Sequence, residues 1–205
     1  MLSVAKSVSG AITVKRIEQA LQPLRNSPEK GPLGHEKGAG VAIVLAGRAT
    51  APSICFIERV ERAGDRWSGD VAFPGGWAQD DDGGLKFTAM RETFEEVGIE
   101  LCLEQHIACL PTSSIPAARA GSTGYLGASV FYVGEAIPTL TPDPKELADA
   151  FWVPCTHLAD STHATTIDWA GADMPAVEFD RRIIWGLTHR VLREFFTLVG
   201  QVDAS

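Results

Sequence analysis

Residues 85–97 read LKFTAMRETFEEV, and we expect this stretch to form the helix around which the fold is organised. At about 100° per residue, Glu92, Glu95 and Glu96 stand at positions i, i+3 and i+4 and fall within one arc of the helix. Gly98 follows at once, and glycine suits the left-handed position that ends a helix. The pattern therefore predicts a helix with one acidic face.

The other side of this helix is apolar and is the predicted core face. Its side chains are Met90, Phe94 and Val97. Arg91 lies one turn before Glu95 and can reach its carboxylate.

Three like charges on one helical face are unfavourable unless a positive charge neutralises them. Clustered carboxylate oxygens suit Mg²⁺ or Mn²⁺ rather than zinc. Such a site can bridge phosphate oxygens and lower the pKa of a bound water, as diphosphate hydrolysis requires. Gly75 and Gly76 precede the helix and have no Cβ, so their backbone can approach a metal or a phosphate. The alternative is a solvated acidic face, and spacing alone does not separate the two.

The segments on either side of the helix predict a mixed sheet with helices packed on its faces. A β-rich run at 40–46 and another at 53–59 suggest two strands joined by a short connection at 47–52. Further strands are expected at 71–73, 126–133 and 151–154, with a loop at 111–124 and an irregular stretch around His157, His163, Asp168 and Asp173. Apolar residues at helical spacing predict further helices at 14–25 and 182–199.

The composition limits the classes of function. The chain has 205 residues and a formal net charge of −8, which argues against a surface built to hold a nucleic-acid backbone. Its apolar stretches are far shorter than the roughly 20 residues that span a bilayer, so we expect no membrane partner. We also expect one catalytic domain, and a cytoplasmic location because the amino terminus has no signal-like segment.

The run from Gly75 to Ile99 resembles the Nudix box, G-x5-E-x7-R-E-U-x-E-E-x-G-U. Its second half, R-E-x-x-E-E-x-G-I, matches at every charged and glycine position. It departs from the box at Thr93, where a bulky aliphatic residue is usual, and at the first acid. With Gly76 as the first glycine, the matching acid is Asp82, followed by one extra residue.

This variant of the box is similar to that of coenzyme A diphosphatases. Residues 69–76, GDVAFPGG, also resemble the G-x3-F-P-G-G of the coenzyme A signature. The signature expects an arginine four residues before its first glycine, where this chain has Asp65 beside Arg66. Either Arg59 or Arg66 is then the expected substrate contact. Residues 146–154 and 184–188 are also similar to this subgroup.

The resemblance implies a role for each matching residue. Glu92, Glu95, Glu96 and the Gly75 carbonyl would bind Mg²⁺ or Mn²⁺, with Glu92 also a candidate to activate water. Arg91 would orient the glutamates, and Glu146 is a candidate general base, although it could simply begin a helical turn. Gly76 would contact substrate. Apart from the resemblance, Trp77 follows the two glycines and could stack on a base, the alternative being a core or interface residue.

The fold implied is α+β, a Nudix-type α/β/α sandwich with a mixed sheet and added N- and C-terminal helices. Its expected limits are an N-terminal helix and linker at 1–39, a Nudix hydrolase domain at 40–200 and a tail at 201–205. The expected partner is a small-molecule nucleoside diphosphate derivative, and assembly as a homodimer is left open.

The leading function is hydrolysis of a diphosphate bond, with coenzyme A or a derivative as the first substrate to test. ADP-ribose, a nucleotide sugar, a dinucleoside polyphosphate or an oxidised nucleotide are the alternatives within the enzyme class. A Nudix sensor that binds nucleotides without cutting them is the alternative outside it. Such sensors usually lose a glutamate of the box, and here Glu92, Glu95 and Glu96 are all present.

Overall fold

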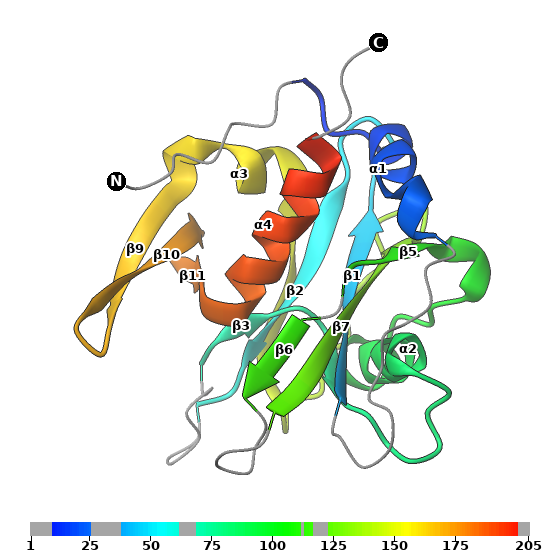
Figure 1. Ribbon diagram of the computed structural model, residues 1–205, viewed down its shortest axis with the longest axis horizontal. Coiled ribbons are helices and arrows are strands. Elements are labelled where there is room, and N and C mark those ends of the chain that lie inside the picture. The colour runs from blue at the N-terminus through cyan, green and yellow to red at the C-terminus, as the bar shows by residue number, and fades with distance from the viewer. Residues whose placement is uncertain (1–9, 26–37, 62–68, 112, 117–122, 201–205) are drawn as a thin grey trace.

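A mixed eight-stranded sheet forms the centre of the protein (Figure 1). The computed structural model describes residues 10–25, 38–61, 69–111, 113–116 and 123–200. The main path of the sheet runs β3-β2-β1-β7-β5, while β4 pairs with β1, β6 with β7 and β8 with β2. Its strands are β1 (Gly38–Ala46), β2 (Ser53–Arg59), β3 (Val71–Ala72), β4 (Gly75–Trp77), β5 (His106–Cys109), β6 (Ser113–Pro116), β7 (Thr123–Tyr132) and β8 (Leu147–Pro154).

The central strand β1 is buried along nearly its whole length because helices cover both faces of the sheet. Alternate residues serve the two faces. Ile43 and Leu45 join the core cluster on the side of α1 and α4. Ala42 and Val44 join the cluster on the side of α2. The parallel pairing of β1 with β7 confirms the expected mixed sheet.

The helices fall into two layers. On one face, α1 (Val14–Leu21) continues into the 3₁₀ turn η1 (Gln22–Leu24) and packs against α4 (Gly186–Gly200). On the other face lies α2 (Leu85–Val97), whose bounds match the predicted helix. The shorter elements are η2 (Leu103–Gln105), α3 (Cys155–Ala159) and η3 (Ser161–His163).

A second, antiparallel sheet was not predicted. It contains β9 (Ala164–Trp169), β10 (Ala172–Phe179) and β11 (Arg182–Ile184), and it stands beside the main sheet at the left of Figure 1. The stretch expected to be irregular is therefore α3, η3 and a hairpin. Because β9 and β10 are largely exposed, their side chains lack the apolar alternation that marks a half-buried strand.

The predicted helix at 182–199 is wrong at its start. Residues Arg182–Ile184 form β11 and pair with β10, and α4 begins only at Gly186. Gly186 has φ of 61°, a conformation that glycine adopts without strain and that separates the strand from the helix.

The predicted loop at 111–124 contains β6 and the first residues of β7. The residues that follow the predicted strand at 71–73 form a further short strand, β4, which was not predicted. In the helix α2, Phe94 is wrongly assigned to the core, since it is 58% exposed. The face that packs on the sheet includes Ala89 and Thr93 instead.

Among the described residues, no helix combines the length and the apolar character needed to cross a membrane.

Gly98 provides a test of the α2 terminus. It is left-handed, with φ of 74°, and an added Cβ would collide with the Thr141 hydroxyl, which donates to the Val97 carbonyl at 3.3 Å. We expect Gly98→Ala to lower the free energy of unfolding by more than about 1 kcal/mol. Gly171→Ala is the control, because Gly171 has φ of 82° but nothing within 4 Å. Equal losses in urea unfolding would contradict the steric part of this account.

Candidate active site

The helix α2 lies unusually close to the sheet at its first turn, and two glycines make this possible. A Cβ on Gly40 of β1 would collide with the Leu85 carbonyl oxygen, and one on Gly127 of β7 would lie 3.0 Å from the Leu85 Cβ. Both glycines therefore let α2 rest directly on β1 and β7. This contact sets the direction of the rest of the helix relative to the sheet.

In its last turn, α2 reaches β4 through Glu96. This side chain is only 5% exposed, and its Oε2 accepts a hydrogen bond from the Gly75 N–H at 2.8 Å. Ala42 N–H donates to Pro74 O and Ala78 N–H donates to Gly38 O, so Gly75 occupies the alternate, unbonded position of the β1–β4 ladder. Its carbonyl then points away from β1, as its N–H does.

Gly76 lies against the carboxylate of Glu92. A Cβ built there would lie 2.5–2.8 Å from the carboxyl atoms of Glu92. Any larger residue at Gly76 would therefore push Glu92 aside. Trp77, the next residue, is 40% exposed on β4 and has the accessible ring that stacking requires.

Arg91 gathers the acidic groups around α2. Its Nη1 donates to Glu92 Oε1 at 2.7 Å and to Glu95 Oε2 at 3.1 Å. Its Nε and Nη2 hold the two oxygens of Asp82 at 3.0 and 2.9 Å, the bidentate geometry that a guanidinium forms with a carboxylate. Nη2 also lies 3.3 Å from the Trp77 carbonyl.

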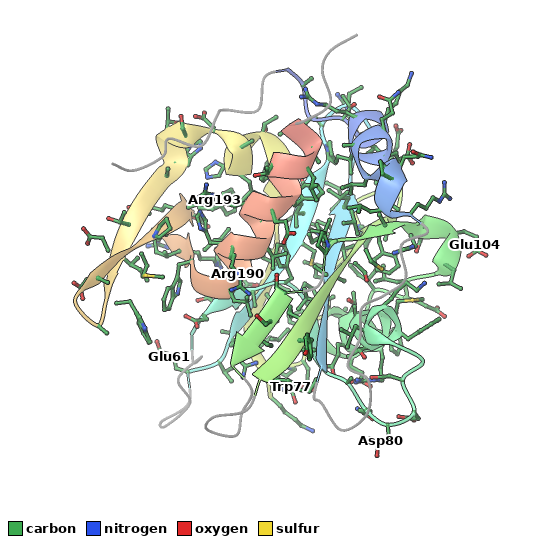
Figure 2. All side chains as sticks on the ribbon, viewed as in Figure 1. Glu61, Trp77, Asp80, Glu104, Arg190 and Arg193 are labelled. Atoms are coloured by element: carbon green, nitrogen blue, oxygen red, sulfur yellow. The ribbon has the colours of Figure 1, made fainter. Side chains whose placement is uncertain are left out.

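The sequence left the role of Asp82 open, and the structure gives it a position. Its carboxylate binds Arg91 and also accepts from the Thr88 hydroxyl at 2.8 Å and the Gln79 N–H at 2.9 Å. The hydrogen bonds from Arg91 lower the pKa of Asp82 from 3.8 to about 2. Figure 2 shows the loop between β4 and α2, with Asp80 labelled near its tip. The extra residue of the box lies between Asp82 and Arg91, and the contact between these two side chains forms in its presence.

Thr93, the other departure from the box, is fully buried. Its hydroxyl donates to the Ala89 carbonyl at 2.6 Å, which satisfies the polar atom within the helix.

The carboxylates nearest the sheet are destabilised as anions. Burial raises the pKa of Glu96 to about 8, and burial likewise raises the pKa of Glu92. Each is also repelled by Glu146. A bound divalent cation would relieve both effects, and a donor set of carboxylate and carbonyl oxygens fits Mg²⁺ or Mn²⁺.

Arg91 supplies the positive charge for Glu92 and Glu95 in this structure. Within the part of the chain that is described, no three His, Cys, Asp or Glu side chains are arranged as a metal site. The ligand set of Glu92, Glu95 and Glu96 therefore stays a prediction that rests on their donor chemistry.

A small cavity brings together predicted site residues from three distant segments. Its volume is about 130 Å³, and it is lined by Arg59, Val60, Glu96, Glu146 and Leu147. The candidate substrate arginine and the candidate base thus face the most buried glutamate of α2. Arg66 lies outside the described residues. The turn preceding β8, which carries Glu146, is held by Glu146 N–H donating to Asp143 O at 3.0 Å.

A model of the NUDIX domain matches residues 36–170 of this chain. The chain belongs to the Nudix family. A crystal structure of a MutT/nudix family protein from Enterococcus faecalis superposes with a TM-score of 0.59 at 14% identity, covering 93% of this chain and 75% of that one. The Nudix fold expected from the sequence is thereby confirmed.

Two relatives of this Nudix protein have names that specify an activity. Peroxisomal coenzyme A diphosphatase ndx-8 of Caenorhabditis elegans is 31% identical over 135 residues, which cover 64% of this chain and 54% of that protein. Mitochondrial coenzyme A diphosphatase NUDT8 of Homo sapiens is 29% identical over 163 residues, which cover 77% of this chain and 66% of that protein. The chain thus spans about half to two-thirds of the length of these relatives.

The Asp82–Arg91 contact predicts a pH dependence of stability. Because folding lowers the pKa of Asp82 from 3.8 to about 2, its contribution is fully present above about pH 4 and is lost as the pH falls through 2. We expect Asp82→Asn to lower the free energy of unfolding by about 1–2 kcal/mol at neutral pH, and by less as the pH falls below 4. Urea unfolding across this range measures the difference.

Asp80→Asn is the matched control, since Asp80 is an exposed residue of the same loop. It should leave stability unchanged. A deficit of Asp82→Asn that stayed constant down to pH 2 would contradict the assignment.

Proposed function

We propose that this Nudix protein is a metal-dependent diphosphatase that hydrolyses a nucleoside diphosphate linked to another group. The contact between Glu96 and Gly75 carries this proposal, because it aligns the acidic face of α2 with the backbone of β4. Glu92 joins the same surface through Gly76. The family match at residues 36–170 supports the hydrolase reading.

Glu92, Glu95, Glu96 and the Gly75 carbonyl would hold Mg²⁺ or Mn²⁺. When bound, such ions supply neutralisation of the diphosphate charge and a water of lowered pKa. Arg91 keeps Glu92 and Glu95 in place, and Asp82 keeps Arg91 in place.

Residues outside the metal-ligand set are the candidates for the other tasks of the reaction. Glu146 is the candidate base that accepts a proton from the attacking water as its oxygen bonds to phosphorus. The bond from phosphorus to the bridging oxygen breaks, and two phosphorylated products leave. Arg59, which lines the same cavity, is the candidate to bind a phosphate of the substrate. Trp77 is the candidate platform for a base.

Coenzyme A or a derivative is the leading substrate. Two observations support it, the 69–76 segment GDVAFPGG and the two relatives named as coenzyme A diphosphatases. The cytoplasmic location and the homodimer stay predictions, and the names of those relatives give peroxisomal and mitochondrial locations instead.

The test is a product analysis. We expect the purified chain with Mg²⁺ to convert coenzyme A to phosphopantetheine and adenosine bisphosphate faster than it cleaves ADP-ribose or NADH. EDTA should abolish turnover, because the carboxylate face of α2 supplies no electrophile of its own. Faster turnover of ADP-ribose or NADH would redirect the substrate assignment.

Glu95→Gln should lower kcat by about 100-fold or more, as expected for removal of a group that holds the catalytic charge. Glu104→Gln is the control, because Glu104 is an exposed glutamate of η2 outside the site. If no compound is cleaved while coenzyme A still raises the melting temperature, the chain is a nucleotide-binding sensor and the enzyme proposal fails.

A further inference from the structure

Two side chains from beyond the family match contact segments next to the cavity. Arg182 begins β11 and Trp185 follows that strand, whereas the NUDIX model ends at residue 170. Arg182 Nε donates to Glu58 Oε2 of β2 at 2.8 Å, and its Nη2 donates to Asp149 Oδ2 of β8 at 2.5 Å. One guanidinium therefore joins both strands.

The two strands need this positive charge. Glu58 and Asp149 are direct partners in the antiparallel β2–β8 pair, and like charges opposite each other weaken such a pair. Arg182 forms an ion pair with each of them and also lies over the Phe151 ring, with its Cζ 4.3 Å from the ring centroid. Asp180 accepts from its Nη1 at 3.2 Å on the exposed side.

On β2, the first residue that lines the cavity is Arg59, which directly follows Glu58. The register shifts between Glu58 and Arg59, so that Arg59 pairs with Leu147. The Val60 N–H then donates to the Glu146 carbonyl at 3.0 Å. Glu58 thus binds Arg182, while its neighbour Arg59 and the partner residue Glu146 both line the cavity with Glu96.

Trp185 supports the same point from the other side of β2. Its Nε1 donates to the Asp70 carboxylate at 3.0 Å. The Asp70 carbonyl in turn accepts from the Arg59 N–H at 3.1 Å. The backbone N–H groups of residues 59 and 60 are therefore bonded to the carbonyls of Asp70 and Glu146. Within the 182–185 segment, Trp185 binds the Asp70 side chain and Arg182 binds β2 and β8.

We propose that Arg182, assisted by Trp185, is a positioning residue that acts through the backbones of β2 and β8 to hold Arg59 and Glu146 against Glu96. The inference rests on the proposed function for the roles of Arg59 and Glu146. It assigns to the β9–β11 sheet the task of fixing the geometry of the cavity. Arg182 itself does not line the cavity, so its effect on turnover is indirect.

The kinetic test compares three variants. Arg182→Ala should lower kcat and raise KM, with kcat/KM falling about tenfold or more, because small displacements of positioned groups are costly. Arg182→Lys should recover part of the loss, since it keeps the charge but lacks the planar fork. Arg190→Ala is the matched control, because this exposed arginine of α4 donates to the Ser114 carbonyl of β6 at 3.4 Å and does not line the cavity (Figure 2).

Amide hydrogen exchange gives a readout that does not need activity. Arg182→Ala should speed exchange at the amides of Arg59 and Val60 relative to amides of β1 and β7, and Arg190→Ala should not. Wild-type kinetics and unchanged exchange in Arg182→Ala would overturn the proposal. If the wild-type protein cleaves no substrate, the proposed function fails, and the exchange rates still decide whether Arg182 positions the strands.

Discussion

The hydrogen bond between the Gly75 N–H and the Glu96 carboxylate is the constraint on which the site depends. A carboxylate this deeply buried is costly unless a donor or a cation compensates it. Here the hydrogen bond from Gly75 compensates it and connects the last turn of α2 to β4. The glycines at 40 and 127 bring the first turn onto the sheet, so both ends of the helix are fixed. Glycine is needed at these contacts because any Cβ would separate the helix from the strands.

Two arginines offset part of the negative charge of the clustered carboxylates. Arg91 binds Asp82, Glu92 and Glu95 on one side of the sheet. Arg182 binds Glu58, Asp149 and Asp180 where the main sheet meets the small one. A chain with a net charge of −8 can therefore offer carboxylates to cations without losing the alignment of its strands. The same acidity is compatible with an anionic substrate because bound cations would lie between the two.

The parts of the site that follow from local sequence were predictable. The bounds of α2 and the left-handed Gly98 came from helical periodicity and from the conformational freedom of glycine. The strand at 53–59 came from its β-branched and aromatic residues. Phe94 was misassigned because periodicity gives the angle between side chains but not which arc of the helix meets the sheet.

Contacts between distant segments were not predictable. Asp82 could be found as the acid of a lengthened box. Its hydrogen bonds with Arg91 depend on the conformation of the loop between β4 and α2. The role of Arg182 had no local signal, since its partners Glu58 and Asp149 lie 124 and 33 residues away in sequence. The β9–β10 hairpin was missed because an exposed hairpin has little apolar alternation. Only the tertiary structure brings these groups together.

The most direct measurement is anomalous diffraction at the manganese edge from crystals of the wild-type protein soaked with Mn²⁺. The account predicts a peak between the acidic face of α2 and the Gly75 carbonyl, bound by Glu92, Glu95 and Glu96. The Arg91–Glu92 and Arg91–Glu95 contacts should lengthen as the cation takes over their charge. Manganese bound only elsewhere, or absent from a fully accessible site, would contradict the claim that this helix is the metal-binding centre of a diphosphatase.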